Sequence, residues 1–165
     1  MNIDHKISLP GKILEISPVS VYGGKTFTQV VKVVLENGVK LLIYDVHKYS
    51  ESADVGCLRE LYVTASTLSP QHPLVKNEMH TKYIVPSSPA NDEPTYWAAD
   101  YSGCLEAIEI PEGLKKKPYQ FPYLGIVDVG VGTIAVPIFN EDFNQFRTGD
   151  YIQATAASLY LKGIM

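Results

Sequence analysis

The stretch Lys25–Asp45, with the sequence KTFTQVVKVVLENGVKLLIYD, decides the fold of this chain. Apolar residues recur at every second position towards Leu35, which is the period of a β-strand with one face in the core. Asn37-Gly38 ends this run, and the dipeptide favours a type I′ turn because both residues tolerate a positive φ. A second apolar run follows over residues 39–46. The stretch therefore predicts a long antiparallel hairpin, with these residues on its core face: Phe27, Val31, Val33 and Leu35.

The sequence on either side of the hairpin predicts more β structure. Residues 11–21 are spaced like a strand and lead into a Gly-Gly loop before Lys25. Residues 50–58 (SESADVGCL) begin with serines and acids, which is typical of one short helical turn. Residues 60–68 (ELYVTASTL) predict a fourth strand. Since no window shows a sustained apolar period of 3.6 residues, the sequence predicts an all-β fold.

The same layout occurs a second time, 92–95 positions further along the chain. GKILEIS at Gly11 matches GCLEAIE at Gly103, and FTQVVKVVLENG has the same length as FPYLGIVDVGVG. A repeat of this period predicts two small barrels in tandem. The matched positions are Phe27 with Phe121, Val33 with Val127, Gly38 with Gly132, Ile43-Tyr44-Asp45 with Ile138-Phe139-Asn140, and Gly56 with Gly149.

A proline-rich segment separates the two copies. Residues 69–95 contain repeated prolines and a polar tail, and within them residues 82–85 suit a closing strand. The sequence therefore predicts a first barrel over residues 1–85, a linker over residues 86–95 and a second barrel over residues 96–165.

The order of strand, loop, long hairpin, short helical segment and further strand resembles the OB fold, the oligonucleotide/oligosaccharide-binding barrel of five strands. GKILEIS, the Lys25–Asp45 hairpin and YVTAS carry the resemblance in the first copy; GCLEAIE, YQFPYLGIVDVGVGTIAVPIF and TGDYIQATA carry it in the second. The resemblance implies two tandem OB-like barrels. The expected fifth strands are residues 81–85 in the first barrel and SLYLKGI, residues 158–164, in the second.

Charge limits the partners of the chain. The net charge of −4 argues against a general polyanion binder, whose affinity comes mainly from neutralised phosphates. Residues 1–92 have no net charge, whereas residues 93–165 carry all of the excess acid. If one half contacts nucleic acid, the first half is therefore better suited to it.

In OB proteins, the first loop and the face of strands 2 and 3 contact single-stranded nucleic acid, so the resemblance also implies candidate binding residues. Lysines in such loops follow phosphates, and aromatic rings stack on bases. The opposing interpretation is that the glycines and lysines form soluble turns and that the tyrosines cover the core. The candidate nucleic-acid-binding residues are Tyr22, Lys25, Lys32, Lys40, Tyr44, Lys115, Lys116, Lys117 and Tyr119, with Tyr123 on the following strand.

The sequence contains no motif of an enzyme, a metal site or a cofactor site. His5, His47, His72 and His80 lack the spacing of zinc ligands, and no nucleophile elbow, P-loop or GxGxxG occurs. We interpret Cys57 and Cys104 as reduced buried thiols. No apolar run reaches the length of a membrane span, and the first residues lack the apolar core of a signal peptide. We therefore expect a cytoplasmic, non-enzymatic protein that uses no metal or cofactor and no membrane.

Two classes of function remain open. One is binding of single-stranded DNA or RNA, and the alternative is a protein-interaction or assembly module that pairs with itself or with another chain through strand edges and tyrosines. The positions of the lysines distinguish them, since a continuous basic groove with exposed tyrosines favours nucleic acid and scattered lysines favour a protein partner.

Overall fold

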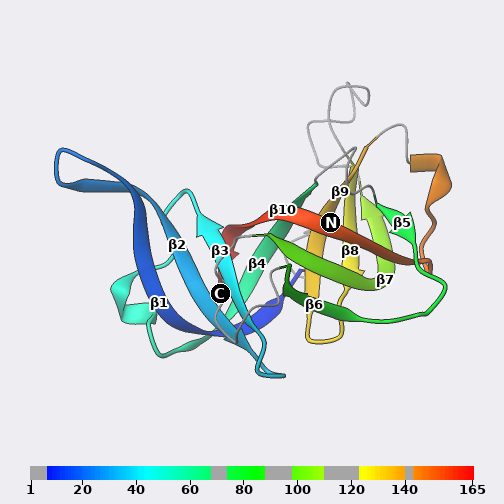
Figure 1. Ribbon diagram of the computed structural model, residues 1–165, viewed down its shortest axis with the longest axis horizontal. Helices are drawn as coiled ribbons and strands as arrows, with labels where there is room; N and C mark the ends of the chain where they lie inside the picture. Colours follow the sequence, from blue (N-terminus) through cyan, green and yellow to red (C-terminus); the bar gives the residue numbers. More distant parts are fainter. Residues whose placement is uncertain (1–6, 68–73, 88–97, 110–122, 140–142) are drawn as a thin grey trace.

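The computed structural model of the protein describes residues 7–67, 74–87, 98–109, 123–139 and 143–165, and it confirms the all-β, barrel-like prediction (Figure 1). The first half contains β1 (Leu9–Tyr22), β2 (Lys25–Leu35), β3 (Lys40–Asp45), the 3-10 helix η2 (Ser52–Asp54), β4 (Leu58–Thr67), β5 (Val75–Lys76) and β6 (Tyr83–Pro86). The second half contains β7 (Ala99–Glu109), β8 (Tyr123–Asp128), β9 (Thr133–Ile138), the 3-10 helix η3 (Phe143–Gln145) and β10 (Tyr151–Ile164).

Strands from both ends of the chain form a first closed ring. β1 lies between β2 and β4, and β3 continues the sheet on the far side of β2. The last part of β10 closes the ring, because Tyr160 pairs in parallel with Tyr44 of β3 while Leu159–Ile164 pairs antiparallel with β4. The strand order around the ring is therefore β1-β2-β3-β10-β4.

A second ring follows the same plan. β7 pairs with β8 and with the first part of β10, and β8 pairs with β9. Here the end of β4 closes the ring, since Thr64 pairs in parallel with Ala135 of β9 and Ala65 pairs with Leu159 of β10. The strand order is β7-β8-β9-β4-β10, which is the order of the first ring with β4 and β10 exchanged.

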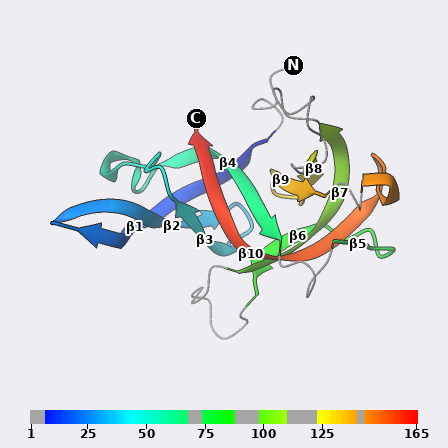
Figure 2. The ribbon, with the colours of Figure 1, turned by 90° about the horizontal axis from the view of Figure 1, so that it is seen from above.

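The two rings thus exchange their fifth strands. β4 and β10 each begin in one ring and end in the other, and they lie side by side where they cross (Figure 2). The expected fifth strands were therefore misplaced: Tyr83–Pro86 pairs with β7 of the second ring, and SLYLKGI completes the first ring. Residues 88–97 lie outside the described residues, so the division at 86–95 stays a prediction.

The registers of the two rings confirm much of the sequence repeat. Ile13 pairs with Val33, Leu105 pairs with Val127, and a β-bulge follows Ile13 and Leu105 alike. The Gly56 amide donates to the Ile13 carbonyl oxygen at 2.7 Å, and the Gly149 amide donates to the Leu105 carbonyl oxygen at the same distance. The predicted matches of Val33 with Val127 and of Gly56 with Gly149 are therefore confirmed. The two glycines have φ values of +87° and +98°, which explains the residue type at this turn.

Two predicted matches are wrong. The Leu35 amide donates to the Val39 carbonyl oxygen and the Val129 amide donates to the Gly132 carbonyl oxygen, so Gly132 corresponds to Val39 and not to Gly38. Val33 pairs with Leu41, and Val127 pairs with Ile134, so the second hairpin is one residue shorter than the first. Ile43 therefore corresponds to Val136, not to Ile138. The sequence match of Ile43 with Ile138 instead makes the second hairpin one residue longer than the first. That match rests on the similarity of Ile-Tyr-Asp and Ile-Phe-Asn in residue type.

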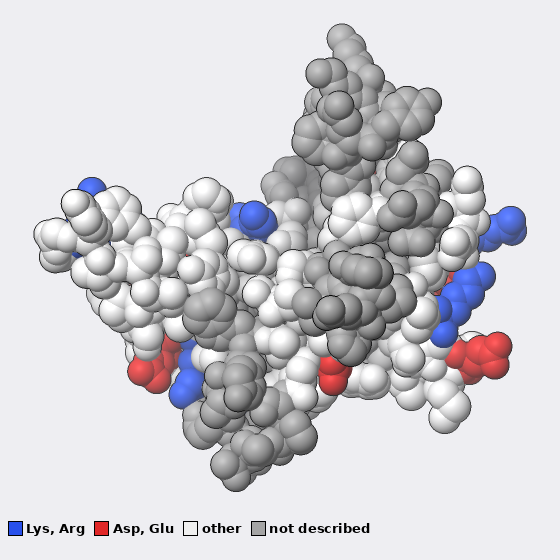
Figure 3. Space-filling model, turned by 45° about the horizontal axis from the view of Figure 1, so that its top comes forward, with Lys and Arg blue, Asp and Glu red and all other residues white. Residues whose placement is uncertain are grey.

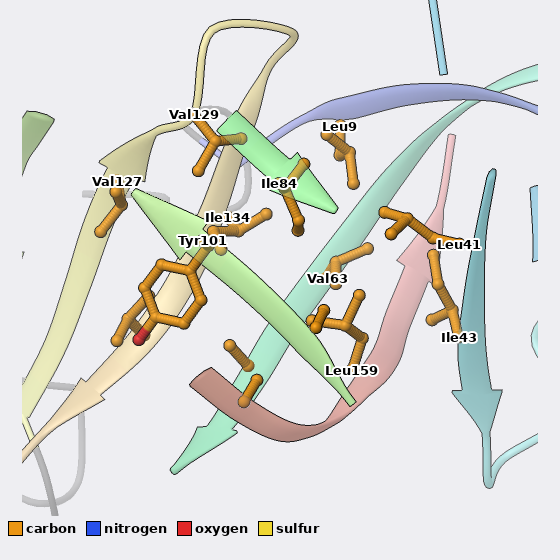
Figure 4. Close-up of a cluster of buried hydrophobic side chains, with 14 of the residues drawn as sticks. Leu9, Leu41, Ile43, Val63, Ile84, Tyr101, Val127, Val129, Ile134 and Leu159 are labelled. Atoms are coloured by element: carbon orange, nitrogen blue, oxygen red, sulfur yellow. The ribbon is translucent and has the colours of Figure 1, made fainter. Parts of the chain in front are cut away.

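A single hydrophobic core extends through both rings. Figure 4 shows side chains of the first ring meeting side chains of the second around the exchanged strands. Burial of each large aliphatic side chain contributes about 1.5–3 kcal/mol, so the shared core couples the stability of the two rings. The labelled members are Leu9, Leu41, Ile43, Val63 and Leu159 on strands of the first ring, Tyr101, Val127 and Ile134 on strands of the second, Ile84 on β6 beside β7, and Val129 just after β8.

Phe27 does not belong to this core, contrary to the sequence prediction. Half of its side-chain surface is exposed, at 50%. The register passes from Ser20 opposite Thr28 to Val21 opposite Thr26, so Phe27 is the extra residue of a β-bulge. A bulge interrupts the alternation of the two faces, and alternation was the basis of the prediction.

The turn at Asn37-Gly38 also differs from the expected type I′. A type I′ turn needs a positive φ at both central residues, but here Gly38 has a φ of +87° and Asn37 has no positive φ. The Gly38 amide donates to the Leu35 carbonyl oxygen at 2.9 Å, and the Leu35 amide donates to the Val39 carbonyl oxygen at 2.8 Å. The hairpin is therefore a three-residue loop, a type I turn followed by a left-handed glycine.

We predict that Gly38→Val destabilises the protein. A Cβ at this position meets no atom within 4 Å, so the loss comes from the positive φ alone. The left-handed conformation costs about 1–2 kcal/mol for a residue with a Cβ. Gly38→Asn is the matched control, because asparagine tolerates this region better and should lose less. Urea denaturation midpoints measure both variants, and equal midpoints for wild type and Gly38→Val would contradict the turn assignment.

A second stability prediction concerns Tyr101, which is 1% exposed and whose hydroxyl has no hydrogen-bond partner among the described residues. An unsatisfied buried polar group costs about 1–3 kcal/mol, so Tyr101→Phe should raise the free energy of unfolding by about 1 kcal/mol or more. Tyr123→Phe, on a half-buried tyrosine of β8, serves as the matched control and should not stabilise the protein.

Burial also raises the pKa of Tyr101 above its ordinary value. The unfolded chain therefore loses this proton at a lower pH than the folded protein does. Above about pH 10 the folded state binds more protons, so the free energy of unfolding should fall as the pH rises. Unfolding measured between about pH 8 and 11 should show a smaller alkaline loss in Tyr101→Phe than in wild type. Identical pH profiles would contradict the burial of the hydroxyl.

Candidate functional site

Three of the predicted binding residues share the outer face of β2 and β3. Buried and half-buried residues alternate along both strands, so Lys32, Lys40 and Tyr44 project from the side opposite to the core. The register places Val34 opposite Lys40, Lys32 opposite Leu42 and Val30 opposite Tyr44. Lys32 is thus a diagonal neighbour of both Lys40 and Tyr44, at the usual diagonal distance of roughly 7–8 Å.

The exchanged part of β10 adds two residues that the sequence did not predict. Tyr160 pairs in parallel with Tyr44, and their ring centroids are 5.9 Å apart with an edge-to-face angle of 75°. The Lys162 ammonium nitrogen lies 5.8 Å from the centroid of the Tyr160 ring. An aromatic pair with an adjacent ammonium group therefore stands beside Lys32 and Lys40.

β1 completes this face on the other side of β2. Lys12 pairs with Val34, and Glu15 pairs with Lys32, whose ammonium nitrogen is 3.7 Å from a Glu15 carboxylate oxygen. Four lysines and one glutamate thus gather on one face of a chain whose net charge is −4. We call this surface the β2–β3 face, and define it by the residues Lys12, Glu15, Lys32, Lys40, Tyr44, Tyr160 and Lys162.

Polar contacts hold Tyr44 in place. The Tyr44 hydroxyl is 3.4 Å from the Thr28 hydroxyl, which in turn donates to the Ser20 hydroxyl at 2.9 Å. The ring is therefore tied to both strands of the β1–β2 hairpin.

A buried network fixes the end of β3 directly after Tyr44. One Asp45 carboxylate oxygen accepts hydrogen bonds from the Gln29 amide (3.0 Å), the Ser50 backbone N–H (2.9 Å) and the Ser50 hydroxyl (2.6 Å), and the other accepts from the Tyr49 N–H (2.8 Å). Because its buried polar groups have partners, the network anchors the strand that carries Tyr44.

Tyr22 and Lys25 lie elsewhere, at the tip of a two-stranded arm formed by the ends of β1 and β2. The arm projects away from the first ring at the left of Figure 1. Lys25 is five residues from Val30, the partner of Tyr44, so it lies roughly 15 Å along the strand from the aromatic pair. Tyr22 is 81% exposed, and the Lys25 ammonium nitrogen lies 5.9 Å from the Phe27 ring centroid. The structure thus separates Tyr22 and Lys25 from Lys32, Lys40 and Tyr44.

The remaining predicted residues belong to the second copy, where Lys115, Lys116, Lys117 and Tyr119 lie outside the described residues. The corresponding face of the second ring is covered. Ile7 is fully buried against Ile126 and Ala135, and the Ser8 backbone exchanges hydrogen bonds with Thr133 at 2.8 and 2.9 Å. Residues 7 and 8, just before β1, thus cover the middle of the surface of β8 and β9 that corresponds to the β2–β3 face.

Several basic side chains outside the β2–β3 face are paired with carboxylates. Lys82 lies 2.7 Å from Asp128, and this hydrogen bond, together with the charge of Asp128, raises the pKa of Lys82. Arg59 pairs with Asp54 at 3.0 Å and Lys76 with Asp150 at 3.5 Å. On the view of Figure 3, Lys and Arg stand apart from one another with Asp and Glu between them, so that view shows no continuous basic groove.

Other chemistries find little support in the part of the chain that the structure describes. No group of three or more His, Cys, Asp or Glu residues is arranged there to hold a metal ion. Cys57 and Cys104 are both free thiols and half-buried, so they are less buried than the sequence analysis expects. No helix within the described ranges has the length and apolar character needed to cross a membrane.

Comparison with known proteins identifies no family. No known family matches the sequence, and neither does any curated protein. Among solved structures, the chain is similar to the cytoplasmic molybdate-binding protein ModG with molybdate bound, at 14% identity and a TM-score of 0.45, over 100% of this chain and 97% of that one. A likeness of this degree carries no argument about what this chain binds.

Proposed function

We propose that the protein binds single-stranded nucleic acid through the β2–β3 face and catalyses no reaction. The observation that carries the proposal is the meeting of the Tyr44–Tyr160 pair with four lysines on one surface. Bases stack on aromatic rings whatever their sequence, and lysines neutralise the phosphates between them. The proposed ligand is therefore a short single strand of DNA or RNA.

The strand order supports this proposal. We propose that both rings are OB-like barrels, because each is a five-stranded ring with a central antiparallel hairpin and a short 3-10 helix before its fourth strand. In this fold the face of strands 2 and 3 is the usual binding surface, and strands 2 and 3 of the first ring are β2 and β3. The fold is an analogy, and the residues on the face carry the argument.

The charge distribution sets the expected strength of binding. The net charge of −4 opposes a long polyanion, whereas the β2–β3 face is locally basic. Contacts from three or four lysines should give a slope of about −2 to −3 in a plot of log affinity against log salt, using about 0.7 per phosphate of a single strand. We therefore expect modest affinity that weakens clearly as salt is raised.

Tyr160→Ala should weaken binding of a mixed oligonucleotide of about ten bases by about 1–3 kcal/mol, because the variant loses a stacking surface. Tyr160→Phe keeps the ring and serves as the matched control, with affinity close to wild type. Fluorescence anisotropy of a labelled oligonucleotide measures both. If wild type shows no affinity even at about 50 mM salt, the proposed function is wrong.

The lysines are tested by the salt dependence. Lys40→Ala combined with Lys162→Ala should reduce the slope by roughly 0.7 for each lost phosphate contact. Lys76→Ala, on β5 beside the first part of β10, is the control and should leave the slope unchanged. Triple replacement of Lys115, Lys116 and Lys117 by alanine tests the loop of the second copy in the same way. A slope unaffected by the Lys40 and Lys162 changes would place the ligand away from the β2–β3 face.

A second candidate function is self-association, and the exposed apolar side chains of the arm favour it. Val19, Val21, Tyr22 and Phe27 are all exposed there. Tyr22→Ser with Phe27→Ser should lower the mass measured by light scattering from that of a defined oligomer to that of a monomer. Met79→Ser, another highly exposed apolar residue, is the control. A monomeric wild-type protein would exclude this candidate.

A further inference from the structure

Glu15 is the one acidic residue on the β2–β3 face. It pairs with Lys32 across β1 and β2, and 59% of its side-chain surface is exposed. One carboxylate oxygen accepts a hydrogen bond from the Ser17 hydroxyl at 3.2 Å, and the other lies 3.7 Å from the Lys32 ammonium nitrogen. The carboxylate is therefore held from two sides and still faces solvent.

Stability gives little reason for an acid at this position. An exposed ion pair contributes about 0–1 kcal/mol, and a separation of 3.7 Å is long for such a pair. For a phosphate ligand, a carboxylate among the lysines is unfavourable because like charges repel. Glu15 therefore favours binding only if the ligand presents a hydrogen-bond donor to it.

The register places Glu15 close to the aromatic pair. Glu15, Lys32 and Leu42 form one row across the sheet, and Ser17, Val30 and Tyr44 form the next. Two strand spacings separate β1 from β3, which is roughly 10 Å. The Glu15 carboxylate accepts a hydrogen bond from Ser17, which belongs to the row of Tyr44, and the Tyr44 hydroxyl reaches Thr28 of β2. The edge of a base stacked on Tyr44 can therefore face the Glu15 carboxylate across β2.

We propose that Glu15 selects the base at this position, and the proposal rests on the proposed binding of single strands. A carboxylate accepts hydrogen bonds from an exocyclic amine, as in the pairing of Glu or Asp with the N4 amine of cytosine. Thymine and uracil present a carbonyl oxygen where cytosine has this amine, so two acceptors would meet with no proton between them. Since the Ser17 and Lys32 contacts occupy about two of the four acceptor positions of the carboxylate, the others are available to the base. The site therefore prefers cytosine to thymine, two bases of nearly equal size.

The experiment compares labelled oligo(dC) and oligo(dT) of about ten nucleotides by fluorescence anisotropy, at about 50 mM salt and about pH 8, where cytosine is neutral. Wild type should bind oligo(dC) about fivefold or more tightly than oligo(dT), the lower end of the discrimination that one good base contact gives. Glu15→Gln should bring the two affinities within about twofold, mainly by improving the binding of oligo(dT), because an amide also donates a hydrogen bond. Glu36→Gln removes the same charge at the β2–β3 turn and should keep the wild-type preference.

The outcomes distinguish a failure of the proposed Glu15 role from a failure of the proposed binding of single strands. Equal affinity of wild type for both oligonucleotides, or a cytosine preference that survives Glu15→Gln, overturns the role of Glu15 and leaves the proposed function standing. A similar loss of preference in Glu36→Gln also overturns it, since net charge would then be the cause. No affinity of wild type for either oligonucleotide overturns the proposed function and the role of Glu15 together.

Discussion

The pairing of β4 with β10 is the interaction on which the rest of the structure depends. Leu159 lies opposite Ala65 at the crossing, the Ser158 amide donates to the Ser66 hydroxyl at 2.9 Å, and this hydroxyl donates to the Ser158 carbonyl oxygen at 3.1 Å. Beyond the crossing, each strand supplies the fifth member of the opposite ring. Without this exchange, one edge of β3 in the first ring and one edge of β9 in the second would have unpaired backbone groups. The shared core would also lose Leu159. The two rings are therefore coupled both by hydrogen bonds and by apolar packing.

The same crossing creates the candidate site. Tyr44 ends β3, and it gains an aromatic neighbour only because β10 arrives from the second ring with Tyr160 in parallel register. Lys162, two residues later, brings a positive charge to the same edge. The β2–β3 face thus draws on three strands of the first half and on β10. Formation of this surface is inseparable from the assembly of both rings.

Local sequence patterns predicted the strands, whereas pairing between distant strands determined which ring each fifth strand completes. The alternation in Lys25–Asp45 gave the β2–β3 hairpin, and the placement of Lys32, Lys40 and Tyr44 on one face follows from it. The sequence carries no signal that says which ring a fifth strand completes, because a strand has the same period in either place. Tyr160 was missed for this reason. The prediction for Phe27 was wrong for a different reason. Phe27 lies in a β-bulge, which interrupts the alternation, and the residue types of the sequence do not reveal the bulge.

The first two strands of each ring pair in the same register, but the outer faces of the two rings carry different side chains. Ile7 and Ser8 cover the middle of β8 and β9, whereas the corresponding strands of the first ring keep Lys32, Lys40 and Tyr44 on their surface, next to Tyr160 of β10. The excess acid of residues 93–165 agrees with this division, because a covered face gains nothing from basic residues. Duplication of a fold fixes backbone geometry, whereas function follows from the side chains on each copy. The proposed binding site therefore lies on the first ring, and the strand β10 that comes from the second ring supplies its Tyr160 and Lys162.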